Sequence, residues 1–224
     1  MIYGTGLEGG AVLAAFFVST NLISRILRSQ PHNGIDPKGD RRDARQVFAN
    51  GAVAALGGAA GLIDTGLGLW LVTASLAAAA ADTWATTVGC WSGVLPRLAW
   101  SSRPVPVGTS GGITAAGTAG AVLGALLVSG TAAVVSGMFI LLPAGTLVGF
   151  LGMATDSTLG ALIQGRFRCP TCNEASEWRL HHCGAATQCE GGFAWLNNDG
   201  VNFLATAFAA GTALALWYWL SPPP

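Results

Sequence analysis

AAADTWATTVGCWSGVLPRLAWSSRPVPVGTSGGI, residues 79–113, is the stretch around which we expect the rest of the chain to be organised. This stretch begins as an apolar segment that carries a carboxylate, Asp82. It passes through a short loop with three prolines and two arginines and re-enters apolar sequence at a glycine-rich turn, residues 108–112. Carboxylates bind Mg²⁺ and backbone N–H groups bind phosphate. An acid and such a turn at one face of a membrane therefore suggest metal and phosphate chemistry.

The composition is that of an integral membrane protein. Of the 224 residues, 51% are hydrophobic and only 10% are charged, and the mean hydropathy is +0.52. Soluble domains carry roughly 25% charged residues. The formal net charge of zero says little about partners, because in a membrane protein the positions of the charges matter more than their sum.

The hydropathy pattern predicts an all-α fold, a polytopic membrane helix bundle with six transmembrane helices in one domain, residues 1–224. Each apolar segment is near the ~20 residues that a helix needs to cross a bilayer. We divide the uncharged run between Arg103 and Asp156 at residues 128–131 and expect Pro143 to kink the helix that follows. The first segment is expected to be a retained helix and not a signal peptide, because basic residues follow it and none precedes it. The predicted spans are residues 8–28, 46–64, 66–91, 111–129, 131–164 and 200–220.

The basic residues predict the orientation of this bundle. All eleven lie in or beside the loops after the first, third and fifth segments, and the other connections and both termini contain none. Under the positive-inside rule those three loops face the cytoplasm, or the stroma in a plastid, and both termini lie on the opposite side. The basic residues are Arg25, Arg28, Lys38, Arg41, Arg42, Arg45, Arg97, Arg103, Arg166, Arg168 and Arg179.

Five segments are expected to deliver polar groups to the cytoplasmic level of the membrane. The spacing places each set on one side of its helix, as shown by Asp156, Gly160 and Gln164 at i, i+4 and i+8. A lone Asn or Thr in such a place is commonly a hydrogen bond between helices worth about 1 kcal/mol. Three acids at one level favour a functional site, because intramembrane acids are costly. The other sets are Asp43, Gln46 and Asn50; Asp82, Thr86 and Gly89; and Asn198 with Asn202.

These residues suit phosphoryl transfer. Mg²⁺ is bound by one or two protein carboxylates together with substrate phosphates, and a glycine-rich turn that opens a helix offers backbone N–H groups to a phosphate. Arginines on the same face add contacts to phosphate oxygens, although they also serve topology and lipid headgroup binding. The sequence contains no Walker motif, and the GTSGG turn alone is a weak signal.

Several motifs together resemble the transmembrane-protein-19-like family of integral membrane proteins. The resemblance runs from about residue 41 to residue 204, with the motifs in the same order, although many relatives have a further hydrophobic segment before the first one found here. The characterised plant member is the phytyl phosphate kinase of vitamin E biosynthesis, and the family is distantly similar to dolichol kinases and CDP-diacylglycerol synthases. The motifs are RRDARQVFANG (41–51), ADTWATTVG (81–89), RPVPVGTSGG (103–112), DSTLGA (156–161) and NNDGVNFL (197–204).

The resemblance implies a kinase that uses a nucleoside triphosphate, CTP by family preference, and Mg²⁺ to convert a phytyl or polyprenyl monophosphate into the diphosphate. It implies roles for Asp82 with Thr83, for the turn, for Asp156 and for the final motif. We therefore predict the catalytic residues Asp82, Asp156 and Asp199, with Asp82 and Asp156 as Mg²⁺ ligands. The predicted residues that bind nucleotide and lipid phosphate are Arg42, Asp43, Asn50, Thr83, Arg103, Gly108, Thr109, Ser110, Gly111, Gly112, Asn198 and Asn202.

Two other functions remain open at this point. A nucleotidyltransferase that makes a CDP-lipid would use similar residues. A transporter for a small solute or ion also uses intramembrane acids in glycine-rich helices, but the acids here cluster at the cytoplasmic level and no inverted repeat is visible. The expected partners are a lipid phosphate, a nucleotide and the membrane, and no nucleic acid.

The loop at residues 166–194 is a small cysteine-rich cytoplasmic insertion between the fifth and sixth helices. A CxxC pair, Cys169 and Cys172, is followed by His181, His182 and Cys183 and then by Cys189. This spacing is typical of structural zinc, and disulfides are disfavoured on the reducing cytoplasmic side. The predicted ligands are Cys169, Cys172, Cys183 and one of His181 or Cys189; the alternative is a set of reduced or oxidised thiols in a mobile loop.

Overall fold

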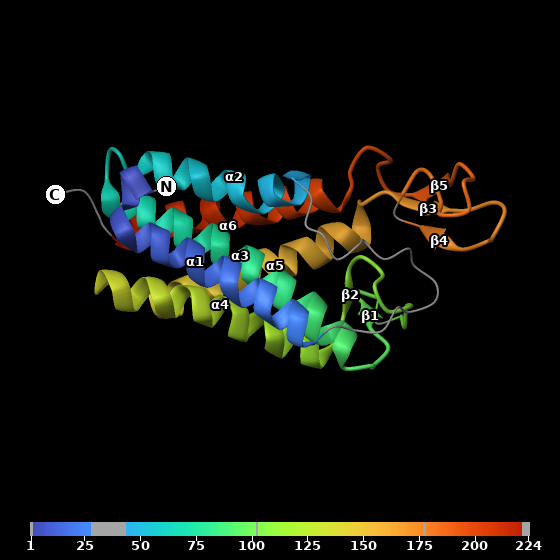
Figure 1. Ribbon diagram of the computed structural model, residues 1–224, viewed down its shortest axis with the longest axis horizontal. Coiled ribbons are helices and arrows are strands. Elements are labelled where there is room, and N and C mark those ends of the chain that lie inside the picture. The colour runs from blue at the N-terminus through green and yellow to red at the C-terminus, as the bar shows by residue number, and fades with distance from the viewer. Residues whose placement is uncertain (1, 28–43, 102, 177, 221–224) are drawn as a thin grey trace.

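The computed structural model describes residues 2–27, 44–101, 103–176 and 178–220. These residues form a bundle of six helices with two small β-sheets at one end (Figure 1). We call the end that carries the strands the β-end. The helices are α1 (Ile2–Ile26), α2 (Ala44–Ala60), α3 (Thr65–Trp91), α4 (Ala115–Ser136), α5 (Leu141–Leu162) and α6 (Asn198–Leu220).

Short strands form in the loops that follow α3 and α5. β1 (Arg97–Leu98) pairs antiparallel with β2 (Gly112–Ile113). β3 (Arg166–Arg168) lies between β4 (Ala175–Ser176) and β5 (Gln188–Gly191), antiparallel to both. The all-α prediction was therefore incomplete, because these loops satisfy part of their backbone hydrogen bonding by strand pairing.

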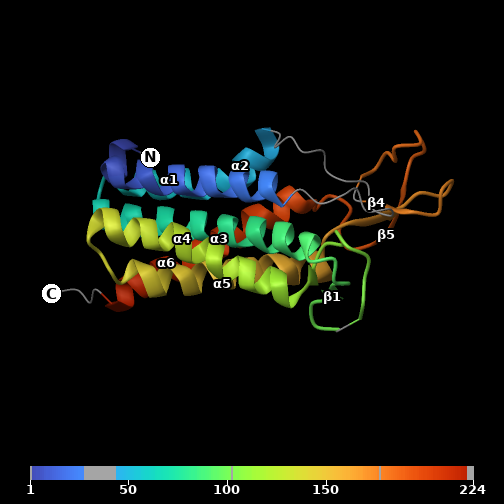
Figure 2. The same cartoon turned by 60° about the horizontal axis from the view of Figure 1, so that its bottom comes forward.

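Helix α3 is the central element of the bundle. It contacts every other helix, and it runs through the middle of the bundle in both views (Figure 2). Residues 72–81 are buried without interruption, and five successive alanines occupy residues 77–81. Neighbouring helices meet this alanine run with glycines, Gly149 and Gly152 of α5 and Gly124 of α4. Small residues on both sides allow the backbones to approach, which is how helices pack in lipid.

Four of the described helices are long and apolar enough to cross a membrane: α1, α3, α4 and α6. α2, with 17 residues, and α5 fall outside this set by the same length and composition criteria. The six predicted helices are all present, and the chain is a mostly helical, multi-pass integral membrane protein with four candidate spans.

Two expectations about the fourth and fifth helices were wrong. α4 continues to Ser136 and ends at Gly137, which has the left-handed φ of 70° that favours glycine, so the division at residues 128–131 lies inside the helix. The sequence did not show where α4 ends, because the stretch between Arg103 and Asp156 contains no charged residue. Pro143 lies in the first turn of α5, where backbone N–H groups have no partner within the helix, and it therefore has no helix before it to kink.

The antiparallel contact between α2 and α3 gives a test of the packing. A Cβ atom added to Gly68 would overlap the Cα of Gly61 and come within 3.1 Å of the Gly57 carbonyl oxygen. Because backbone cannot move aside as a side chain can, Gly68→Ala should destabilise the bundle by about 1–3 kcal/mol. Tryptophan fluorescence during thermal unfolding in detergent measures this effect.

The control is Gly211→Ala in α6, where an added Cβ atom has no neighbour within 4 Å. That change should stabilise the helix slightly, by about 1 kcal/mol at most, because alanine has the higher helix propensity. Equal unfolding temperatures for the two variants would contradict the packing of α2 on α3.

Candidate functional site

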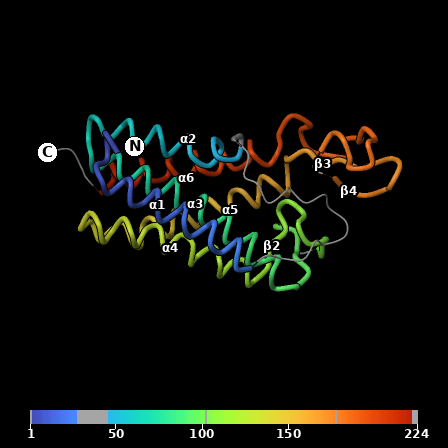
Figure 3. The backbone as a smooth tube through the Cα atoms, in the orientation of Figure 1, coloured from blue at the N-terminus to red at the C-terminus, as the bar shows by residue number. Residues whose placement is uncertain are grey.

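The parallel packing of α3 and α5 brings two acids to one level. Both helices run toward the β-end (Figure 3), and Gly149 and Gly152 of α5 contact Ala77 and Ala78 of α3. Asp82 lies four residues after Ala78, and Asp156 lies four residues after Gly152. Each acid is therefore one helical turn, about 6 Å, beyond the same contact. The register of the two helices places the predicted catalytic acids side by side along the bundle axis.

Helix α6 brings an amide to the same level from the opposite direction. Gly152 also lies close to Ala205 and Ala209 of α6, which begins at the β-end and runs back along α5. Asn202, three residues before Ala205, is one turn nearer the β-end than this contact, as Asp156 is on α5. Asn198 and Asp199 occupy the first turn of α6, about one further turn toward the β-end.

Helix α2 completes this level. Its contacts with α3, Gly57 against Leu71 and Gly61 against Gly68, are antiparallel and place Gln46 opposite Asp82. The hydroxyl of Thr206 in α6 donates a hydrogen bond to the Ala49 carbonyl at 3.5 Å, which confirms the alignment of α2 with α6. Asn50 is one turn deeper in the bundle than Gln46. We call Gln46, Asp82, Asp156 and Asn202 the polar layer.

Burial in the polar layer is high for groups of this polarity. Asp156 is 9% exposed and Asn202 is 4% exposed, whereas Asp82 and Gln46 are half-buried. Gln46, Asp82, Asp156 and Asp199 each take part in a polar or electrostatic interaction. The side-chain oxygen of Asn202 is buried and has no hydrogen-bond partner within the described part of the chain. Such an acceptor is costly unless a further group satisfies it.

The glycine-rich turn is ordered and rests on the end of α5. Gly108 and Gly111 have φ of 88° and 78°, and the backbone N–H of Thr109 donates a hydrogen bond to the Pro106 carbonyl. Gly111 packs so closely on Ala161 that a Cβ atom would come within 2.5 Å of the Ala161 nitrogen. Since Gly160 is one turn beyond Asp156, the turn lies next to the polar layer on its β-end side.

The turn does not open a helix, which corrects the sequence-based expectation. β2 separates it from α4, and Thr114 caps α4 by accepting a hydrogen bond from the Gly117 N–H at 3.0 Å. The turn instead packs on the end of α5 through Gly111 and Ala161, and the side-chain amide of Gln164, two residues beyond that helix, donates to the hydroxyl of Ser110 at 2.8 Å. Any phosphate at this turn would therefore meet backbone N–H groups of a loop and not the dipole of α4.

Two residues near the turn were absent from the predicted site. Gln164, 2% exposed, lies two residues beyond the end of α5, and its i+8 spacing from Asp156 predicted a shared face but no role in binding. Trp100, which has a positive φ of 73°, donates from its indole nitrogen to the Thr158 hydroxyl at 3.2 Å. No sequence signal marks Trp100, because its partner lies 58 residues away.

The remaining predicted residues have varied positions. Arg97 and Arg103 are exposed on the loop that carries β1 and the turn, and the Leu98 N–H donates to the Arg103 carbonyl. Thr83 is half-buried, and its hydroxyl donates to the Ala79 carbonyl one turn earlier. Arg42 and Asp43 lie outside the described residues.

The side-chain oxygen atoms of the polar layer are suitable ligands for Mg²⁺. They are carboxylate and amide oxygens, which this hard cation prefers, and the buried Asn202 oxygen is an acceptor that a cation or its bound water would satisfy. The start of α6 lies next to this layer and is capped by the Asn197 side chain, which accepts from the Gly200 N–H at 3.0 Å. Acids, a buried amide and a loop of backbone N–H groups can together bind a metal-associated phosphate.

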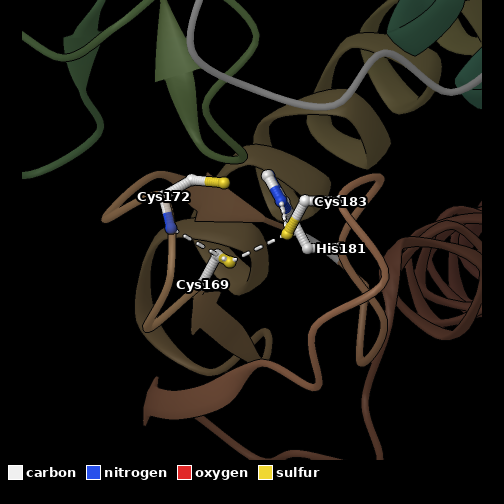
Figure 4. Close-up of side chains that lie close together, drawn as sticks. All are labelled: Cys169, Cys172, His181 and Cys183. Carbon is white, nitrogen blue, oxygen red and sulfur yellow. Dashed lines mark hydrogen bonds between the residues drawn. The ribbon is translucent and has the colours of Figure 1, made fainter.

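A second cluster lies in the insertion that follows α5. The ligand atoms of Cys169, Cys172, His181 and Cys183 all lie within 4.8 Å of one another, and Figure 4 shows the four side chains converging. Cys189 is exposed on β5, where its thiol interacts with the Gly191 carbonyl. The structure thus joins three of the predicted cysteines to His181 and leaves Cys189 outside.

Contacts within the cluster shift the thiol pKa values. Hydrogen bonding to Cys183 and burial raise the pKa of Cys172 to about 12. Burial also raises the pKa of Cys169, but hydrogen bonds from the backbone N–H groups of Cys172 and Thr171 and with the Cys183 thiol outweigh it, and the net shift is downward. Cys169 is therefore the thiol favoured to ionise, and the thiolate is the form that binds metals.

Comparison with known proteins assigns the chain to a family. A profile described as integral membrane protein DUF92 matches residues 1–210. The chain belongs to this family. Membership in DUF92 confirms the resemblance to the transmembrane-protein-19-like proteins, which are members of the same family. It also supports a multi-pass membrane protein.

Two relatives in curated collections are similar over most of the chain. Uncharacterized membrane protein MJ0933 of Methanocaldococcus jannaschii is 31% identical over 165 residues, which cover 73% of this chain and 68% of the relative. Protein PGR of Arabidopsis thaliana is 27% identical over 237 residues, which cover 91% of this chain and 79% of the relative. No solved structure matches the chain.

Proposed function

We propose that this DUF92 protein is a membrane-embedded kinase that transfers a phosphoryl group from a nucleoside triphosphate to a lipid monophosphate. The observation that carries this proposal is the alignment of Asp82 and Asp156 at one level beside Asn202, with the glycine-rich turn directly on the β-end side. The family resemblance favours CTP as the donor and phytyl or polyprenyl phosphate as the acceptor. The product would be the isoprenoid diphosphate.

Binding of Mg²⁺ would explain why carboxylates lie inside the membrane bundle. A carboxylate inside a membrane bundle is expensive and commonly marks an ion or substrate site. Asp82 and Asp156, with Asp199 nearby, would hold Mg²⁺, which neutralises and orients the phosphates of the nucleotide. Asp82 and Asp199 are half-buried, so they are partly exposed, and a soluble nucleotide would reach them from the β-end.

The rest of the machinery positions and neutralises phosphate. Backbone N–H groups of the turn and the exposed Arg97 and Arg103 would bind phosphate oxygens as negative charge shifts during transfer. Gln164 holds the turn on α5 through Ser110 and so fixes the distance between the turn and Asp156. The substrate phosphate is already ionised at neutral pH, so its oxygen attacks the terminal phosphorus without a general base. The bond to the nucleoside diphosphate then breaks.

Membrane topology fits this chemistry if all six helices cross the bilayer. α2 contacts α1, α3 and α6 along its length, and its 17 residues span about 26 Å, close to the ~30 Å hydrocarbon core. α5 packs against α3, α4 and α6, and Asp156 of α5 is 9% exposed and would therefore be largely shielded from lipid. The β-end would face the cytoplasm, because the described basic residues of the loops after α3 and α5 lie there, and lipid phosphate would reach the polar layer from the inner leaflet.

A reconstituted assay tests the proposed reaction. Purified protein in lipid is incubated with Mg²⁺, each of several nucleoside triphosphates and a panel of prenyl monophosphates, and the products are identified by mass. The expected product is a prenyl diphosphate together with the nucleoside diphosphate. A CDP-lipid would show a nucleotidyltransferase instead. Solute flux in proteoliposomes without nucleotide consumption would favour a transporter.

Neutralising either acid of the polar layer should remove activity. Asp82→Asn and Asp156→Asn keep the side-chain shape but lose the negative charge that holds the cation. We expect turnover to fall by at least about 100-fold, the scale seen when one electrostatic contact to a transition state is lost. Conversion of γ-labelled nucleotide into labelled lipid measures turnover, and the unfolding temperature is recorded for each variant.

Asp64→Asn is the matched control. Asp64 is the N-cap residue of α3, at the end of this helix opposite to Asp82. Its exposed carboxylate accepts a hydrogen bond from the Leu67 N–H at 3.1 Å. Asparagine caps a helix nearly as well as aspartate, so this variant should keep both stability and turnover. Wild-type turnover in Asp82→Asn or Asp156→Asn would remove the acids from the mechanism.

The orientation can be measured at the two ends of α3. Ile63 is 94% exposed in the connection between α2 and α3, and Val94 is 59% exposed in the loop after α3. A membrane-impermeant maleimide should modify Ile63→Cys in intact cells and Val94→Cys only after permeabilisation, with the labelled peptides located by mass spectrometry. Labelling of both sites from the outside would show that α3 does not cross the membrane.

A further inference from the structure

We propose that Cys169, Cys172, His181 and Cys183 bind one structural Zn²⁺ ion. This site lies outside the polar layer, and the proposed kinase reaction does not use it.

The distances match tetrahedral coordination. The Cys169 and Cys183 sulfurs are 3.6 Å apart, and the Cys183 sulfur is 3.2 Å from Nδ1 of His181. Bonds of ~2.3 Å from zinc to sulfur give a tetrahedral edge of about 3.8 Å. A disulfide would need sulfurs at ~2.05 Å, and all five cysteines are free. Three thiolates and one imidazole form a ligand set that selects zinc over Mg²⁺ or Ca²⁺.

Neighbouring groups hold the ligands in place. Nε2 of His181 lies 3.4 Å from a carboxylate oxygen of Glu174, which leaves Nδ1 directed toward the sulfurs. A carboxylate behind a ligating histidine is the usual second partner at zinc sites, because it fixes the tautomer and the ring orientation. The backbone N–H of Cys172 donates to the Cys169 sulfur at 3.5 Å. Cys169 is fully buried and His181 is 3% exposed, so the site is partly shielded from water.

The other candidate set at this place is weaker. Glu174, His181 and His182 also have ligand atoms within 4.8 Å of one another. That set has only three members, shares His181 with the thiol cluster and is exposed at Glu174 and His182. Because Nδ1 of His181 is directed at Cys183, the thiol set is the one that the geometry assembles.

The surrounding sheet explains why a metal is needed. β3, β4 and β5 contain three, two and four residues, and a sheet this small is marginal in water without a further constraint. A metal that binds only the folded form contributes its binding free energy to folding. The two segments that connect the sheet to α5 and α6 are joined to each other, because the Gly165 N–H donates to the Leu196 carbonyl and the Phe193 N–H donates to the Ile163 carbonyl, both at 2.9 Å. Zinc would therefore also stabilise the connection that carries Gln164.

Metal analysis of the purified full-length protein tests the proposal directly. The protein is prepared without chelators, and its zinc and iron are measured by mass spectrometry. We expect about one zinc per chain, as a single tetrahedral site requires. Replacement by Co²⁺ should give the strong visible absorption of a tetrahedral site and thiolate-to-cobalt charge-transfer bands. Absence of zinc, both as purified and after incubation with Zn²⁺ under reducing conditions, would overturn the proposal, as would stoichiometric iron.

Two matched cysteine variants separate this cluster from other thiols. Cys172→Ser removes an exposed member of the set, and Cys189→Ser removes an exposed cysteine of the same sheet that is outside it. Zinc should fall at least several-fold in Cys172→Ser and stay at the wild-type level in Cys189→Ser. Equal retention in both variants would contradict the ligand set. If Cys172→Ser does not fold, the cobalt spectrum of wild-type protein still decides, since oxygen-only ligation gives no charge-transfer bands. These readouts need no kinase activity.

Discussion

The cost of burying charge in a membrane bundle is the constraint on which the rest of this structure depends. Asp156 is almost completely buried and Asp82 half-buried in a chain with few charged residues. Such groups persist where other polar groups or cations share their surroundings. Here the polar layer collects two amides and two acids from four helices, and the hydrophobic core of the bundle consists mainly of alanine and aliphatic side chains.

Close packing of small residues fixes the positions of the helices, and so of the two acids, along the bundle axis. The alanine run of α3 meets glycines on α4 and α5, so the helix backbones lie near one another and cannot slide without steric overlap. A fixed register between α3 and α5 is what sets Asp82 beside Asp156. A bundle held by large, flexible side chains would tolerate shifts along the axis and would not fix the relative positions of the two acids as narrowly.

The loops at the β-end extend this geometry beyond the helices. The turn with Gly111 fits against Ala161 because glycine leaves no Cβ in that contact, and Gln164 secures it through Ser110. Gln164 itself begins the segment that leads into the sheet around the Cys/His cluster. The proposed zinc site and the proposed phosphate site are thus linked through a short, continuous piece of backbone, although each is assembled from different residues.

Sequence alone determined the class and the family of the protein. Composition and apolar segment length identified a multi-pass membrane protein with six helices, ordered motifs identified the family, and cysteine spacing identified three members of the Cys/His cluster. Only the tertiary structure decided that His181 and not Cys189 completes the cluster, that the turn rests on α5, that α4 extends to Ser136 and that Asn202 lies level with Asp156. The reason is physical. Sequence spacing reports which side chains share a face of one element, whereas the contacts between elements depend on how separate backbones pack, and local sequence does not record that.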